Sequence, residues 1–321
     1  MDGASLNRTS DARQALEPEI ARIVDRLEPL LGTLAGEAAP LEGGITNRNY
    51  RARLGDRDYV VRVPGKDTSL LEIDRAVERQ ANEQAAALGI APAVAASLDD
   101  PECIVTLWVE GTGMSAEALR EPDATRSVAA ALRRLHDSGE TLGTSFDSFR
   151  IVETYERTAR ERGARVPEAF GEALERARQI EAALSGPEHE PVPCHNDLLA
   201  ANFIATPDGI RIVDWEYAGM GNRYFDLANF AINNELDEVR QRELLEAYFG
   251  ETPTAAQFAS LRLMRFMSDF REAMWGVVQS GVSELDFDFI EYADTHFERM
   301  QRTAADPSFE RSLAEARGAA G

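Results

Sequence analysis

The feature that most constrains this sequence is an ordered set of three polar residues in its second half. Asp197 and Asn202 lie five positions apart in one predicted loop. Asp214 comes directly after an apolar run, residues 210–213, that is typical of a short buried strand. The turn at Gly209 predicts a hairpin whose two arms bring Asn202 and Asp214 together.

This spacing points to phosphoryl transfer. The reaction needs a carboxylate that orients the acceptor hydroxyl and oxygen ligands that hold magnesium on nucleotide phosphates. Asp197 fits the first role, and Asn202 and Asp214 fit the second. Taken singly, each could be an ordinary turn residue, because Asp and Asn side chains bond to their own backbone. The ordered set is harder to explain in that way and therefore favours chemistry.

The residues just before this loop are predicted to be structural. His195 is expected to fix the loop by hydrogen bonding rather than to exchange protons. Cys194 and His195 together resemble a metal pair, but no third or fourth ligand accompanies them. A divalent-metal hydrolase built on His195 and Asp197 is disfavoured for the same reason.

The first third of the chain predicts a small β-rich lobe. After a helix over residues 18–34, apolar runs predict strands at 50–54, 59–63 and 104–109. Arg62 alternates with the apolar residues of its strand, so its side chain is either solvated or directed into a cleft. The following helix, residues 71–88, offers Glu72, Glu78 and Glu83 as partners for Arg62. We favour Glu78, and Glu83 remains the alternative.

A glycine pair at residues 43–44 precedes Asn47 and the first of these strands. Backbone N–H groups in such a turn, with Asn47 beside them, could contact phosphate oxygens. A plain β-hairpin turn has the same composition, and the segment alone does not separate the two alternatives.

The chain after residue 110 is predicted to be mainly helical, so a larger α-rich lobe follows the β-rich one. The predicted fold class is α+β with two lobes. Apolar periodicity is lost after residue 305, which predicts a frayed tail. The expected division is a flexible N-terminus at 1–14, a nucleotide-binding lobe at 15–109, a catalytic and acceptor-binding lobe at 110–304, and a flexible tail at 305–321.

Charge and composition exclude several classes of protein. A net charge of −22 and a pI near 4.6 argue against a nucleic-acid-binding or anionic-membrane surface. Two cysteines give no disulfide framework. No apolar stretch is long enough for a membrane span, and residues 1–13 do not read as a signal peptide. We therefore expect a soluble, cytoplasmic protein without membrane insertion; the sequence does not predict its oligomeric state.

Three motifs together resemble a known family. They are His-x-Asp-x4-Asn from His195, Asp-Trp-Glu-Tyr at 214–217 and Tyr-Phe-Asp-Leu-Ala-Asn at 224–229. The chain resembles the choline/ethanolamine kinase branch of the aminoglycoside phosphotransferase-like kinases. The resemblance implies a bilobal, protein-kinase-like fold that binds ATP and Mg²⁺ between its lobes, and an activity as a phosphotransferase with an alcohol group as acceptor.

The resemblance also implies roles for single residues. Asp197 corresponds to the catalytic base, and Asn202 and Asp214 correspond to the magnesium ligands. Arg62 replaces the usual phosphate-binding lysine, with Glu78 as its partner. The remaining implied roles concern adenine binding by the segment Thr106 to Val109 and bracing of the catalytic loop by Asp226.

For the acceptor, the resemblance implies an acidic pocket with aromatic walls, where a quaternary ammonium binds by cation–π attraction. Trp275 resembles one aromatic position. The chain departs from the family at Glu272, where a second tryptophan is usual, and at Asn233, where an acidic residue is usual. The small-molecule alcohol acceptor is therefore choline, ethanolamine or another amino alcohol. Two alternatives remain: an aminoglycoside or other antibiotic O-phosphotransferase, and a nucleotide-binding pseudokinase with a regulatory role.

Overall fold

The fold of the N-terminal part is built on an antiparallel sheet. The computed structural model describes residues 17–41, 47–65 and 68–318 of the chain, so the expected flexible segment at 1–14 and the glycine pair lie outside the described residues. The sheet has five strands in the order β1-β2-β3-β5-β4. Their bounds are β1 Ala39–Leu41, β2 Asn47–Leu54, β3 Arg57–Pro64, β4 Val94–Asp99 and β5 Glu102–Leu107.

Alternation along β3 divides its residues between a core and a cleft. Tyr59, Val61 and Val63 are buried in the core that the sheet forms with helix α2 (Pro18–Leu31), whereas Arg62 points to the other face. The predicted placement of Arg62 opposite its apolar neighbours is therefore confirmed.

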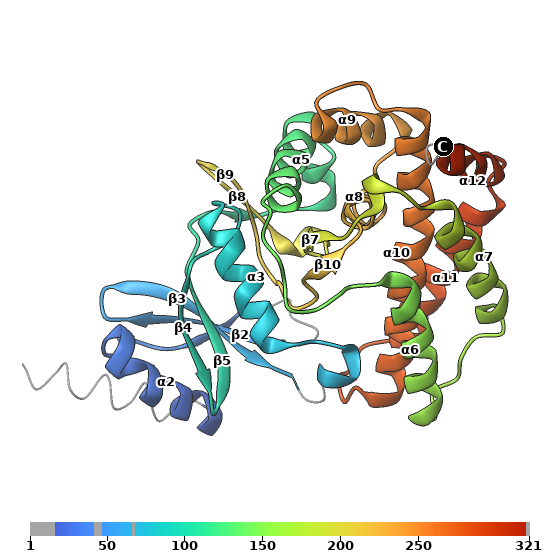
Figure 1. The fold of residues 1–321 in the computed structure, drawn as a ribbon. Helices are drawn as coiled ribbons and strands as arrows, with labels where there is room; N and C mark the ends of the chain where they lie inside the picture. The colour runs from blue at the N-terminus through green and yellow to red at the C-terminus, as the bar shows by residue number, and fades with distance from the viewer. Residues whose placement is uncertain (1–16, 42–46, 66–67, 319–321) are drawn as a thin grey trace, which may run out of the picture.

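Helix α3 (Arg75–Ala87) lies between the sheet and the helical part of the molecule (Figure 1). It follows a short 3₁₀ turn, Thr68–Leu71, and begins at Asp74, whose carboxylate accepts hydrogen bonds from the first-turn N–H groups. Its apolar face joins the larger core of the helical part rather than the core of the sheet. Helix α3 can therefore carry a side chain to the boundary between the two parts.

The second part is mainly helical, as predicted, and the α+β class is confirmed. Helix α10 (Ala255–Val282) runs through its centre and is buried over most of its length, with α6, α8, α11 and α12 packed around it (Figure 1). The helices are α4 Ala116–Leu119, α5 Pro122–His136, α6 Ser148–Glu161, α7 Phe170–Ala183, α8 Arg223–Asn233, α9 Glu238–Phe249, α10, α11 Phe289–Ala305 and α12 Ser308–Gly318, with a 3₁₀ turn at Pro187–His189.

Short strands carry the motif residues between these helices. Strands β8 (Phe203–Thr206) and β9 (Gly209–Ile212) form the predicted hairpin, with Phe203 opposite Ile212. β6 (Thr112–Gly113) pairs with β8, and β7 (Val192–Cys194) pairs with β10 (Gly219–Gly221). The N–H of Val213, just after the hairpin, donates to the backbone oxygen of Asn202 at 2.9 Å, which places Asn202 near Asp214 as expected.

The predicted frayed tail after residue 305 is wrong for residues 308–318, which form α12. Phe309, Leu313 and Ala316 are buried in the larger core, at a spacing of three to four residues that the small and charged residues between them obscured in the sequence. The lobe boundary at 109/110 stays a prediction. Among the described residues, no helix combines the length and apolar character that crossing a bilayer requires.

The burial of α12 predicts a difference between two leucines. Leu313 is 4% exposed, whereas Leu285 is 52% exposed. Replacing Leu313 with alanine should lower the free energy of unfolding by about 2–5 kcal/mol, because it leaves a cavity in a packed core. The matched variant Leu285→Ala should change it by less than about 0.5 kcal/mol. Urea unfolding of both variants measures this; equal, small effects would contradict the docking of α12.

Candidate active site

A buried carboxylate fixes the loop that contains Asp197 by accepting hydrogen bonds from its backbone. Asp226, in the first turn of α8, accepts hydrogen bonds from the backbone N–H groups of His195 at 2.9 Å and Asn196 at 2.6 Å. Asn196 has a left-handed backbone with φ of 67°, a conformation that persists in a non-glycine residue only where its surroundings fix it. Asp226 thus braces the loop, as the family resemblance implied.

His195 has the structural role predicted for it. Its Nε2 lies 3.0 Å from the carbonyl oxygen of Val213, and its Nδ1 accepts the N–H of Asp197 at 3.2 Å. Burial lowers the pKa of His195, which favours the neutral ring that these two bonds require. The ring therefore ties the Asp197 loop to the end of the β8–β9 hairpin.

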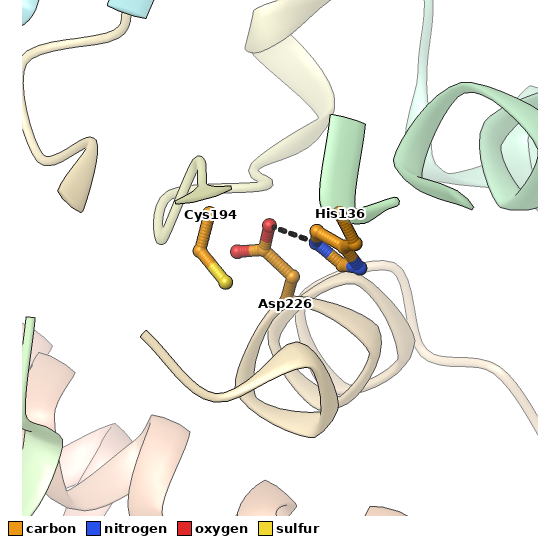
Figure 2. Close-up of side chains that lie close together, drawn as sticks. All are labelled: His136, Cys194 and Asp226. Atoms are coloured by element: carbon orange, nitrogen blue, oxygen red, sulfur yellow. Dashed lines mark hydrogen bonds and ion pairs between the residues drawn. The ribbon is translucent and has the colours of Figure 1, made fainter. Parts of the chain in front are cut away.

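A cluster of His136, Cys194 and Asp226 lies beneath this loop (Figure 2), with its potential ligand atoms within 4.8 Å of one another. His136 Nε2 lies 3.0 Å from Asp226 Oδ2, and His136 Nδ1 lies 2.7 Å from the hydroxyl of Tyr248. Burial raises the pKa of Cys194 well above its usual range, so its thiol stays protonated. Because the histidine and the carboxylate already have partners, we interpret the cluster as a hydrogen-bonded brace.

The two predicted magnesium ligands lie close to Asp197. The side-chain nitrogen of Asn202 donates to the backbone oxygen of Asp197 at 2.9 Å and to its Oδ2 at 3.1 Å. These bonds fix the amide so that its oxygen faces away from Asp197. Asp214 comes directly after the hairpin, with a left-handed φ of 67°. A carboxylate and an amide oxygen are a donor set that fits magnesium.

A cleft of about 350 Å³ lies between the sheet and the hairpin. Arg62 enters it from β3 and forms ion pairs with Asp214 and with Glu78, the latter at 3.2 Å. Thr106 and Val109 line the same cleft, as do Asn202 and Asp214. Burial would lower the pKa of Arg62, but Asp214 and Glu78 raise it further than burial lowers it, so the guanidinium is charged.

The structure shows which glutamate of α3 pairs with Arg62. Glu78 is 4% exposed and contacts Arg62, whereas Glu83 lies on the exposed side of α3 and pairs with Arg79 at 4.0 Å. The carboxylate of Glu78 also accepts from Arg75 at 2.6 Å. The ion pair of Arg62 with Glu78 is therefore present, and its role towards a nucleotide stays a prediction.

Sequence reasoning missed two members of this charged cluster. Arg75 Nη1 lies 3.3 Å from Glu216 Oε2, and its Nη2 donates to Asn47 Oδ1 at 3.2 Å. Asn47 in turn donates to Glu216 at 2.9 Å. Glu216 stands inside the Asp-Trp-Glu-Tyr motif and could have been found there, whereas nothing in the sequence distinguishes Arg75 from other arginines.

Burial and crowding of carboxylates shift the pKa values of the site. Burial, and then the charge of Glu272, raise the pKa of Asp197 well above its usual range, although Arg271 opposes them. Burial, and then the charge of Asp214, raise the pKa of Glu216 to about 7, against the effect of Arg62 and Arg75. Raised pKa values of buried carboxyl groups in a cleft are typical of functional sites.

Of the residues predicted to bind the acceptor, Glu272 and Trp275 lie close together, whereas Asn233 does not join them. Trp275 donates from Nε1 to the hydroxyl of Tyr217 at 2.9 Å, and its ring lies 5.4 Å from that of Tyr292. Glu272, one turn earlier on α10, accepts from the hydroxyl of Tyr292 at 2.8 Å. Arg271, which the sequence did not single out, donates to Glu272 at 2.7 Å.

Asn233 belongs to a different network. Its side-chain oxygen accepts from Arg299 Nη2 at 2.9 Å, and Arg299 Nε donates to Asp269 at 2.7 Å. Within the described part of the chain, no hydrogen bond or ion pair joins Asn233 to Glu272 or Trp275. Its predicted contact with the acceptor stays a prediction.

The chain is similar in sequence and in fold to known kinases. The chain is 29% identical to "Ethanolamine kinase 2" of Rattus norvegicus, in an alignment that covers 87% of this chain and 79% of the relative. It is similar to a crystal structure of a choline/ethanolamine kinase family protein from Mesorhizobium loti, with a TM-score of 0.78, 29% identity, and coverage of 97% and 99% of the two chains.

A further similarity concerns the fold alone. The crystal structure of the choline kinase LicA from Streptococcus pneumoniae matches with a TM-score of 0.75 at 22% identity, covering 88% of this chain and 98% of that one. The predicted bilobal, kinase-like architecture is thus confirmed.

The decisive match is to a family profile. The profile described as "Phosphotransferase enzyme family" matches residues 37–261, a span that contains the sheet strands from β1 to β5, the Asp197 loop and the hairpin. Because the match extends over more than half of the sequence, the chain belongs to the phosphotransferase enzyme family, as its motifs predicted.

Proposed function

We propose that the protein is an ATP- and Mg²⁺-dependent kinase that transfers the γ-phosphoryl group to a hydroxyl of a small amino alcohol, the class that includes choline and ethanolamine. The observation that carries this proposal is that Arg62, Asn202 and Asp214 line one cleft, where Arg62 pairs with Asp214 and Asn202 donates a hydrogen bond to Asp197. The amino-alcohol class is supported by the names of the relatives, an ethanolamine kinase and a choline/ethanolamine kinase family protein.

The cleft suits a nucleotide in its shape and chemistry. Thr106, in strand β5, and Val109, just after it, line the cleft where backbone groups can bind an adenine ring, and Arg62 lines the same cleft from β3. Asn202 and Asp214 would hold magnesium, which when bound neutralises negative charge on phosphate oxygens. Arg62 adds a second positive charge towards the transferring group, held in place by Glu78.

Asp197 is placed to act on the acceptor. In the transfer, the acceptor oxygen forms a bond to the γ-phosphorus, the bond to the ADP oxygen breaks, and the hydroxyl proton passes to a carboxylate. The side chain of Asp197 accepts a hydrogen bond from Asn202. The charges of Glu272 and Arg271, on the proposed acceptor side, affect its pKa. A raised pKa makes this carboxyl group a better proton acceptor than an exposed aspartate.

Removing the carboxylate of Asp197 tests the proposed base. Asp197→Asn should lower ATP-dependent turnover of the acceptor by about 10²–10⁴-fold, because the hydroxyl proton then has no acceptor. Nucleotide binding, measured by calorimetry, should remain. The matched variant Asp208→Asn, in the exposed hairpin turn, should retain full turnover. Full activity of a folded Asp197→Asn protein would contradict the mechanism.

Magnesium removal tests the metal ligands. Chelation with EDTA should abolish ADP release, and added Mg²⁺ should restore it. Asp214→Asn should raise the Mg²⁺ concentration needed for half-maximal turnover by about tenfold or more, since a charged oxygen ligand is lost. A titration of turnover against Mg²⁺ measures this, with Asp208→Asn again as the control. An unchanged titration curve for Asp214→Asn would exclude Asp214 as a ligand.

The geometry around Arg62 predicts different effects for the two glutamates of α3. Glu78→Gln should lower kcat/KM for ATP by about 10–100-fold, because Arg62 and Arg75 lose a buried charged partner. Glu83→Gln should leave kcat/KM within about twofold, since exposed ion pairs contribute little. Steady-state kinetics at saturating acceptor distinguish the two; comparable losses in both variants would refute the assignment of Glu78.

A further inference from the structure

A buried arginine lies next to Glu272, one of the residues predicted to bind the acceptor. Arg271 of α10 is 1% exposed, and its guanidinium carbon lies 4.1 Å from the ring centroid of Tyr217 and 5.8 Å from that of Phe146. Tyr217 belongs to the Asp-Trp-Glu-Tyr motif and bonds to Trp275. A guanidinium therefore occupies an aromatic surface of the kind on which a quaternary ammonium can stack.

The hydrogen bonds of Arg271 are incomplete. Its Nη1 donates to Glu272 Oε1 at 2.7 Å. Among the described residues, none accepts a hydrogen bond from Nε or from Nη2, although both atoms are buried. Leaving such donors of a charged group without partners is unfavourable, and buried arginines normally have acceptors for them.

The two donors without partners suit a particular ligand. Nε and Nη2 lie along the same edge of the planar guanidinium, and their spacing matches the two oxygens of a carboxylate. A bound carboxylate would satisfy both donors at once. A quaternary ammonium could satisfy neither, and it would also be repelled by the positive charge of Arg271.

Glu272 does not satisfy the arginine alone. Its Oε1 accepts from Arg271 and its Oε2 accepts from the hydroxyl of Tyr292, so both carboxylate oxygens have partners. Although burial would lower the pKa of Arg271, Glu272 and the neighbouring groups raise it well above its usual range, so the side chain keeps its charge. Arg271 is thus a charged donor with one edge for which the described residues offer no acceptor.

The site lies close to the reacting hydroxyl. Tyr217, whose ring centroid lies 4.1 Å from the guanidinium carbon of Arg271, accepts a hydrogen bond on its backbone oxygen from Asn196 Nδ2 at 3.0 Å, and Asn196 directly precedes Asp197. We propose that Arg271 binds a carboxylate of the acceptor, so that the alcohol phosphorylated is a small hydroxy amino acid rather than choline. This inference rests on the proposed function and specifies its substrate class.

Matched pairs of alcohols test the inference directly. Serine is ethanolamine with an added carboxylate, and homoserine is 3-aminopropanol with one. ADP release and the mass of the phosphorylated product should show a preference of about 100-fold or more in kcat/KM for the carboxylate-bearing member of at least one pair. Choline should be a poorer acceptor than that member.

Variants of Arg271 separate recognition from a structural role. Arg271→Leu should abolish the preference, and Arg271→Lys, which keeps the charge and loses the two-donor edge, should lower it by about tenfold or more. The control Arg265→Leu removes another guanidinium of α10, near Gln241, and should leave the preference unchanged. Melting temperatures identify any variant that fails to fold, and Arg271→Lys then carries the test.

Three results would overturn the inference. The first is a wild-type preference for choline or ethanolamine over serine and homoserine, which leaves the proposed function intact. The second is an equal loss with both members of each pair in a folded Arg271→Lys protein, as expected of a merely structural arginine. The third is no ATP-dependent turnover of any of these alcohols, which also contradicts the proposed function.

Discussion

The carboxylate of Asp226 is the interaction on which the site depends. It holds the N–H groups of His195 and Asn196, and Asn229, one turn later on α8, accepts the N–H of Leu198 at 2.5 Å. A helix in the wrong place would leave these buried donors without acceptors, at a cost of about 1–3 kcal/mol each. The position of Asp197 is thus set by the packing of α8 in the core, not by the loop itself.

The charged cluster around Arg62 and Arg75 contains more carboxylates than guanidinium groups. Glu78, Asp214 and Glu216 meet the two guanidinium groups of Arg62 and Arg75. Three carboxylates against two guanidiniums leave a negative charge in a partly buried place, which favours a cation. Burial, and then the charge of Asp214, raise the pKa of Glu216. This arrangement agrees with a site for a divalent ion bound together with an anionic nucleotide.

Local signals in the sequence predicted much of this arrangement, and long-range packing explains what they did not predict. The alternation in β3 indicated the direction of Arg62, and the turn at Gly209 indicated the hairpin. The sequence favoured Glu78 as the partner of Arg62 but left Glu83 open, because both are polar positions of one helix and only the docking of α3 buries Glu78. Helix α12 was missed since its few apolar residues become a core face only against α10.

The acceptor side shows the limit of motif reasoning most clearly. Helix α10 is buried on almost every side, so the periodicity of its sequence does not indicate which residues face a ligand. Glu272 and Trp275 were noticed because they stand at positions where the family has tryptophans, but the adjacent Arg271 matched no motif. Its importance follows only from its place against Tyr217 and from the two donors that the described residues leave without acceptors. Short motifs thus predicted the residues that we propose for the transfer, whereas Arg271, which we propose for recognition of the alcohol, could be found only from the packing of its helix.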